Sequence, residues 1–156
     1  MKIKKIFILS YILIILILFG FYLFNHNTNK ICLDDKYYSK GSFIKVKSDS
    51  LSSLKNENYI LFTYNNYCNM AIPCENIFQE FMKKYKIDFL SMPFDEFKKT
   101  SFYKKVKYAP SVIVVEKGKI VAYLDANSDN DLVKYQDVNE FEKWLDNYIG
   151  FSKDDR

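Results

Sequence analysis

The feature that most constrains the fold is a stretch in which a strand leads through two cysteines into an amphipathic helix. Tyr59–Tyr64 is an apolar, aromatic-rich run typical of a buried strand. An Asn-rich turn follows, with Cys68 inside it and Cys74 directly after Pro73. Proline suits the first helical position, where its missing N–H costs nothing. Apolar residues then recur at helical spacing: Ile77, Phe78, Phe81, Met82 and Tyr85.

The two cysteines therefore straddle a strand-to-helix turn, and Cys74 is expected in the first turn of the helix. The first N–H groups of a helix lack intrahelical partners, and the helix dipole is positive at that end. Both effects favour a thiolate over a thiol. This pattern favours redox chemistry at the turn.

The rest of the chain predicts an α/β fold with a mixed central sheet and helices on both faces. Strands and helices alternate early, and a hairpin with Gly118 in its turn comes late. Asp137 followed by Glu140 resembles a capping box at the start of a final helix. The other expected elements are a strand at Phe43–Lys47, a short helix at Ser50–Asn56, a strand at Ile87–Met92, a helix at Phe94–Val106, and hairpin strands at Ser111–Val115 and Ile120–Leu124.

The N-terminus predicts a membrane anchor. Residues 1–5 form a basic head, and residues 6–24 form an apolar run long enough to cross a bilayer as a helix. No Ala-x-Ala site follows, so we expect a signal anchor that is not cleaved. The lysines ahead of the run predict a cytoplasmic N-terminus, a single-pass protein of the cell membrane, and an extracytoplasmic domain.

The remaining boundaries follow from composition. We expect a polar tether at residues 25–41, one domain at residues 42–150 and a tail at residues 151–156. The chain is 49% hydrophobic, so a packed core is expected. Its net charge is +4, but its lysines are scattered and Arg156 is the single arginine. This pattern does not favour nucleic-acid binding.

Residues 43–149 resemble the thioredoxin superfamily. The resemblance rests on the strand Tyr59–Tyr64, the pair Tyr67–Cys68, the pair Pro73–Cys74 at a helix start, and the run Ala109–Val115. It implies a thioredoxin-like fold, a cis proline at Pro110 beside the cysteines, and substrate contacts by Tyr67, Ala109 and Pro110. Small anchored thioredoxin-like proteins that accompany bacteriocin export are similar in size.

The sequence departs from the family pattern at two places. The family motif is Cys-x-x-Cys, whereas Cys68 and Cys74 form a Cys-x5-Cys motif. Many family members also carry a buried carboxylate six residues ahead of the first cysteine, and Phe62 occupies that position here. Loss of the carboxylate favours an oxidase or isomerase over an efficient reductase.

Two functions stay open at this point. In the first, Cys68 and Cys74 are the catalytic pair of a thiol-disulfide oxidoreductase that acts on cysteines of exported proteins or peptides and is recycled by a membrane redox partner. In the second, a structural Cys68–Cys74 disulfide holds a redox-inert binding or assembly module. Neither requires a cofactor or a metal. Copper delivery ranks last, because His26, the single histidine, lies outside the expected domain.

Overall fold

The computed structural model describes residues 30–65 and 73–152. These residues form a five-stranded sheet in the order β1-β3-β2-β4-β5. Strand β3 is parallel to both β1 and β2, whereas β4 is antiparallel to β2 and to β5. The strands are β1 (Phe43–Lys45), β2 (Asn58–Tyr64), β3 (Phe89–Pro93), β4 (Ser111–Glu116) and β5 (Lys119–Tyr123). The predicted mixed sheet and its hairpin are confirmed.

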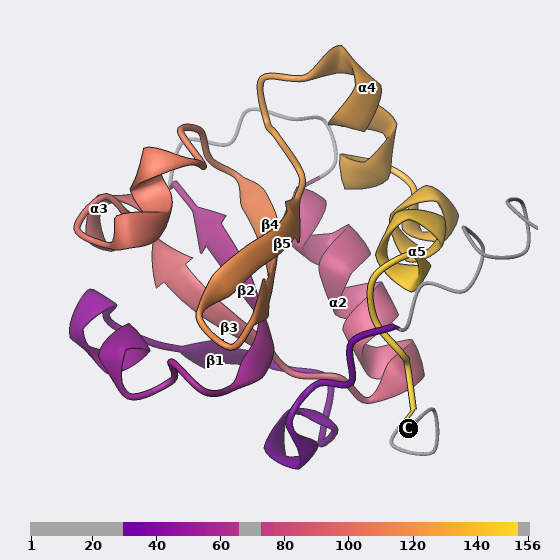
Figure 1. Ribbon diagram of the computed structural model, residues 1–156. Helices are drawn as coiled ribbons and strands as arrows, with labels where there is room; N and C mark the ends of the chain where they lie inside the picture. The colour runs from indigo at the N-terminus through magenta and orange to yellow at the C-terminus, as the bar shows by residue number, and fades with distance from the viewer. Residues whose placement is uncertain (1–29, 66–72, 153–156) are drawn as a thin grey trace, which may run out of the picture.

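Helices cover both faces of this sheet, as Figure 1 shows, with α2 and α5 side by side on one face and α3 on the other. The α-helices are α2 (Cys74–Tyr85), α3 (Phe94–Phe97), α4 (Asp129–Leu132) and α5 (Val138–Asp146). Short 3-10 helices complete the fold: η1 (Asp35–Tyr37), η2 (Ser48–Ser52), η3 (Ser101–Lys104) and η4 (Val133–Tyr135).

The core between the sheet and α2 is mainly aromatic. The ring of Phe78 from α2 lies 5.3 Å from Phe62 of β2 and 4.7 Å from Phe141 of α5. Phe81, one turn further along α2, packs against Phe89 of β3 and Phe141. All five side chains are almost fully buried. Residues spaced three and four apart in the sequence thus meet on one helix face, as the helical period requires.

Three expected helices differ in detail from the prediction. In place of the short helix expected at Ser50–Asn56, the structure has the 3-10 helix η2 (Ser48–Ser52). The segment predicted as one helix at Phe94–Val106 is divided into α3 and η3, because the backbone of Thr100 is extended. The Thr100 hydroxyl donates to the Phe97 carbonyl at 2.8 Å, a local bond that competes with helix continuation. Pro73 precedes α2 as its N-cap and is not its first helical residue.

The final helix begins as predicted, with Asp137 as its N-cap. The Asp137 carboxylate accepts hydrogen bonds from the N–H groups of Asn139 and Glu140. The reciprocal half of the capping box does not form, because the Glu140 carboxylate instead bonds to Lys143 at 2.6 Å. The polar segment before Asp137 contains α4 and η4.

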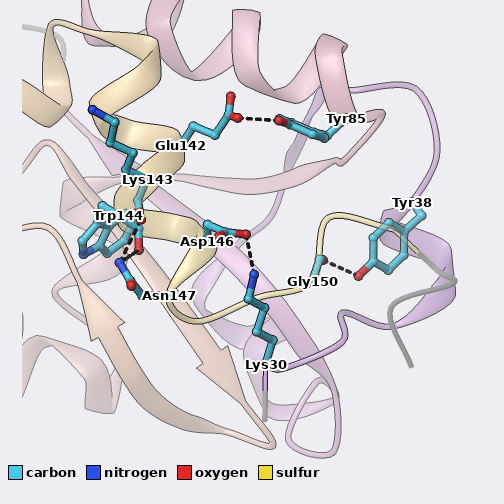
Figure 2. Close-up of polar contacts among 9 residues, drawn as sticks. All are labelled: Lys30, Tyr38, Tyr85, Glu142, Lys143, Trp144, Asp146, Asn147 and Gly150. Atoms are coloured by element: carbon cyan, nitrogen blue, oxygen red, sulfur yellow. Dashed lines mark hydrogen bonds and ion pairs between the residues drawn. The ribbon is translucent and has the colours of Figure 1, made fainter. Parts of the chain in front are cut away.

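Residues 30–41, which we expected to belong to a tether, pack onto the domain. Ile31, Leu33 and Tyr37 are buried. The backbone of Ile31 forms hydrogen bonds with Tyr148 and Gly150, beyond the end of α5. Figure 2 shows Lys30 pointing to Asp146 and Tyr38 pointing to Gly150. The Lys30 ammonium lies 2.6 Å from the Asp146 carboxylate, and the Tyr38 hydroxyl donates to the Gly150 carbonyl oxygen at 2.9 Å. The packed domain therefore begins before residue 42, because these apolar side chains find a place in its core.

No helix within residues 30–65 and 73–152 is both long and apolar enough to span a membrane. The predicted membrane helix at residues 6–24 and the last four residues, 153–156, of the predicted tail at 151–156 lie outside the described residues.

A substitution at Gly41 tests whether residues 30–41 belong to the fold. It has a φ of +72°, and a Cβ atom there would lie 2.3 Å from the Met82 carbonyl oxygen near the end of α2. Gly41→Ala should therefore lower the free energy of unfolding by at least about 2 kcal/mol, from left-handed strain and overpacking together. Urea unfolding followed by the fluorescence of Trp144 measures the change.

The matched control is Gly118→Ala. Gly118 has a similar φ of +75°, but its nearest neighbour to an added Cβ is 3.2 Å away. This variant should lose less stability than Gly41→Ala. Equal losses would mean that backbone strain alone acts at residue 41 and that the contact with α2 contributes nothing.

Candidate active site at the start of helix α2

Cys74 is the first residue of α2 and is only 2% exposed. The helix begins here because Pro73 has an extended ψ of 121° and its carbonyl oxygen accepts the N–H of Asn76 at 3.0 Å. The predicted position of Cys74 in the first turn is confirmed. A side chain at this position lies among the N–H groups that have no intrahelical acceptor.

Pro110 faces the same place from the start of β4. The Ala109–Pro110 peptide bond is cis, as the resemblance implied. Cys74 and Pro110 line one pocket of about 200 Å³. The described residues that line this pocket are Phe62, Tyr64, Asn65, Pro73, Cys74, Glu75 and Pro110. Ala109 is half-buried and is not among them.

Two of the predicted site residues cannot be placed. Cys68 and Tyr67 lie outside the described residues, in the turn between β2 and α2. The structure therefore brings together Cys74 and Pro110, whereas the Cys68–Cys74 pairing and the contact by Tyr67 stay predictions.

Phe62 occupies an apolar position beside the thiol. Its ring packs against Phe78 of α2 and Phe43 of β1, at centroid distances of 5.3 and 5.2 Å. Glu75, which is exposed, is the carboxylate among the described residues of this pocket. Within these residues, no carboxylate therefore reaches the thiol from the central strand.

Tyr135 of η4 contacts the Pro110 loop and α2, a role that the sequence did not indicate. Its hydroxyl donates to the Pro110 carbonyl oxygen at 2.8 Å, and its ring packs edge-on against Phe78. The pKa of Tyr135 is raised above its ordinary value, first because the ring is buried, and further by the charges of Asp131 and of a Cys74 thiolate. Tyr135 thus links the proline loop, α2 and η4. An aromatic residue within a polar Asn/Asp segment carried no periodic signal that could have identified it.

No group of three or more His, Cys, Asp or Glu side chains that could hold a metal ion occurs in residues 30–65 and 73–152. His26 lies outside these ranges.

Thioredoxins are among the solved structures with a similar fold. The chain matches thioredoxin NaTrxh from Nicotiana alata with a TM-score of 0.51 and 18% identity, over 72% of this chain and 96% of that one. It matches Schistosoma mansoni thioredoxin with a TM-score of 0.50 and 22% identity, over 71% and 99% of the two chains. No protein-family model and no curated protein sequence matches the chain. The likeness shows the thioredoxin fold.

The hydrogen bond of Tyr135 can be tested without disturbing its ring. Tyr135→Phe keeps the contact with Phe78 but leaves the Pro110 carbonyl without its donor. We expect the free energy of unfolding to fall by about 1 kcal/mol, the usual net value of such a bond. Urea unfolding measures the loss.

Tyr103→Phe is the control for this change. Tyr103 contacts Phe94 and Lys107 through its ring, and its hydroxyl has no hydrogen bond to another described residue. This variant should unfold at the wild-type urea concentration. An equal loss of unfolding free energy in both variants would contradict the role assigned to the Tyr135 hydroxyl.

Proposed function

We propose that this protein is a membrane-anchored thiol-disulfide oxidoreductase that acts outside the cytoplasm on cysteines of exported proteins or peptides. The observation that carries the proposal is the position of Cys74. Its side chain lies at the first residue of α2, in one pocket with the cis proline Pro110. The thioredoxin fold of the domain supports the same chemistry.

The burial of Cys74 supports a division of roles between the cysteines. At 2% exposure, Cys74 is poorly accessible to a protein substrate, so Cys68 is the attacking residue in this proposal. The Cys68 thiolate attacks one sulfur of a substrate disulfide, forms a mixed disulfide and releases the other sulfur as a thiolate. The Cys74 thiolate then attacks the Cys68 sulfur. The substrate leaves with two thiols, and the protein holds a Cys68–Cys74 disulfide.

The reverse sequence donates this disulfide to a substrate dithiol, and the electron pair moves to the protein. A membrane redox partner then reoxidises the two cysteines. Phe62 favours this oxidase or isomerase direction, because no strand carboxylate reaches the thiol to carry its proton. The Pro110 loop would position substrate backbone beside the sulfur, with Tyr67 and Ala109 as further contacts.

The alternative is a redox-inert binding module in which Cys68 and Cys74 form a permanent structural disulfide. The inaccessibility of Cys74 and the apolar side chain of Phe62 favour this alternative as well. Closing so short a loop contributes roughly 2–3 kcal/mol on the chain-entropy model. The two functions differ in how readily the disulfide is reduced.

The reduction potential of the pair separates the two functions. The third cysteine of the chain is removed by Cys32→Ser, so that only Cys68 and Cys74 can react. The full chain is equilibrated in glutathione buffers, and the redox state of the two cysteines is measured by alkylation. An exchanging pair should have a midpoint roughly between −120 and −270 mV. A pair that stays oxidised below about −300 mV is a structural disulfide and contradicts catalysis. The Cys68→Ser variant is the control and should show no two-electron transition.

The anchor and its orientation need a separate test. Ser53→Cys places a thiol on the exposed surface of a chain whose native cysteines are all changed to serine. In intact bacterial cells, a membrane-impermeant maleimide should label this thiol. Deletion of residues 6–24 should abolish recovery of the chain with the membrane fraction. Labelling that requires cell lysis would contradict the extracytoplasmic location.

A further inference from the structure

A second cleft, of about 490 Å³, lies at the opposite end of the sheet from the thiol pocket. Residues of η2, η3 and the β4–β5 turn form its walls, and Tyr59 at the start of β2 lies among them. In Figure 1 the β4–β5 turn and the start of α2 lie at opposite ends of the sheet. The strand from Tyr59 to Tyr64 alone spans about 17 Å. The two sites are therefore separate.

The charge of this cleft is positive. Four lysines line it: Lys55, Lys99, Lys117 and Lys119. No carboxylate lines it among the described residues. Lys99 forms an ion pair with Glu96, which compensates part of its charge. Among the described residues, the ammonium groups of Lys55 and Lys119 have no ion-pair partner. Like charges around one hollow repel each other and raise the local concentration of anions.

Tyr59 supplies a donor within the cleft. The residue is 1% exposed, and its ring packs against Tyr37. Its hydroxyl has no hydrogen bond to any other described residue, although it lies among the lining residues of the cleft. Among the described residues, the one buried side-chain polar atom without a hydrogen-bond partner is the Thr63 hydroxyl oxygen, so the Tyr59 hydroxyl keeps some contact with solvent and is open to a ligand in the cleft. Burial raises the pKa of Tyr59 to about 12, so the group stays protonated and can donate.

The remaining lining has two kinds of surface. Ser101 adds a hydroxyl near the lysines, and Leu51 and Phe102 add apolar side chains. Ammonium groups act as point charges that suit phosphate oxygens, and a phosphate monoester carries nearly two negative charges at neutral pH. Lys55, Lys117 and Lys119 form no ion pair with another described residue, and their three ammonium groups match a ligand with adjacent phosphates better than one with a single carboxylate.

We propose that this cleft binds a phosphate-bearing ligand, with its phosphates between the lysines and its apolar portion against Leu51 and Phe102. The Tyr59 hydroxyl, which has no hydrogen bond to another described residue, donates to a phosphate oxygen. The site is independent of the thiol chemistry. Its phosphates can come from a free phosphorylated molecule or from a lipid headgroup.

The test uses the full chain, labelled with nitrogen-15, in micelles of an uncharged detergent. In one arm, inorganic pyrophosphate is added. In the other arm, phosphatidylglycerol is mixed into the micelles. The amide signals of Gly118 and Lys119, which line the cleft, report binding in both arms. Saturable shifts with pyrophosphate identify a free ligand as the source, and shifts with lipid alone identify a headgroup.

Variants then test the residues. Lys55→Gln with Lys119→Gln should weaken binding at least roughly tenfold, because bonds to charged groups are lost. Tyr59→Phe should weaken binding several-fold and leave the urea midpoint unchanged or higher, since its hydroxyl has no hydrogen bond to another described residue. The charge-matched control is Lys40→Gln with Lys83→Gln, two exposed lysines outside the cleft.

Three results would overturn the proposal. The first is the absence of saturable shifts in both arms. The second is an equal loss of affinity in the control pair, which would mean that net charge alone attracts the anion. The third is full affinity in Tyr59→Phe together with full affinity in the Lys55 and Lys119 variant.

Discussion

The packing of Phe78 is the interaction on which the rest of this structure depends. Its ring contacts Phe62 of the central strand, Phe141 of α5 and Tyr135 of η4. Fully burying one such side chain contributes roughly 1.5–3 kcal/mol. These contacts fix α2 against the sheet in position and rotation. Since Cys74 is the first residue of α2, the same contacts determine where the thiol lies relative to Pro110.

Much of the fold was predictable because its main elements have strong local signals. Helix α2 has apolar residues at helical spacing, and Asp137 caps α5. In the hairpin, Gly118 lies between two runs rich in β-branched residues. The early segment had no such signal. Ile31 and Leu33 follow no period, and their burial depends on contacts with the distant residues around Ile149. Tertiary packing of this kind is invisible to periodicity.

The candidate site was predictable only in part. The helix start explained the position of Cys74, and the resemblance to thioredoxins supplied the cis proline at Pro110. Tyr135 could not be predicted, because it reaches the site through η4, a turn of helix within a polar segment. The second cleft was missed for a similar reason. Lys55 and Lys119 are far apart in the sequence, and they line the same cleft only in the folded domain.

In the proposed membrane-anchored protein, the attachment of Ile31 to the end of α5 would limit the distance between the domain and the membrane. With an anchor ending at Phe24, residues 25–29 alone connect the bilayer to the packed domain. Five residues span at most about 18 Å when fully extended. The domain would then stay close to the lipid surface, with little freedom to turn. Its encounters would be confined to thiols that emerge at, or are attached to, that same membrane.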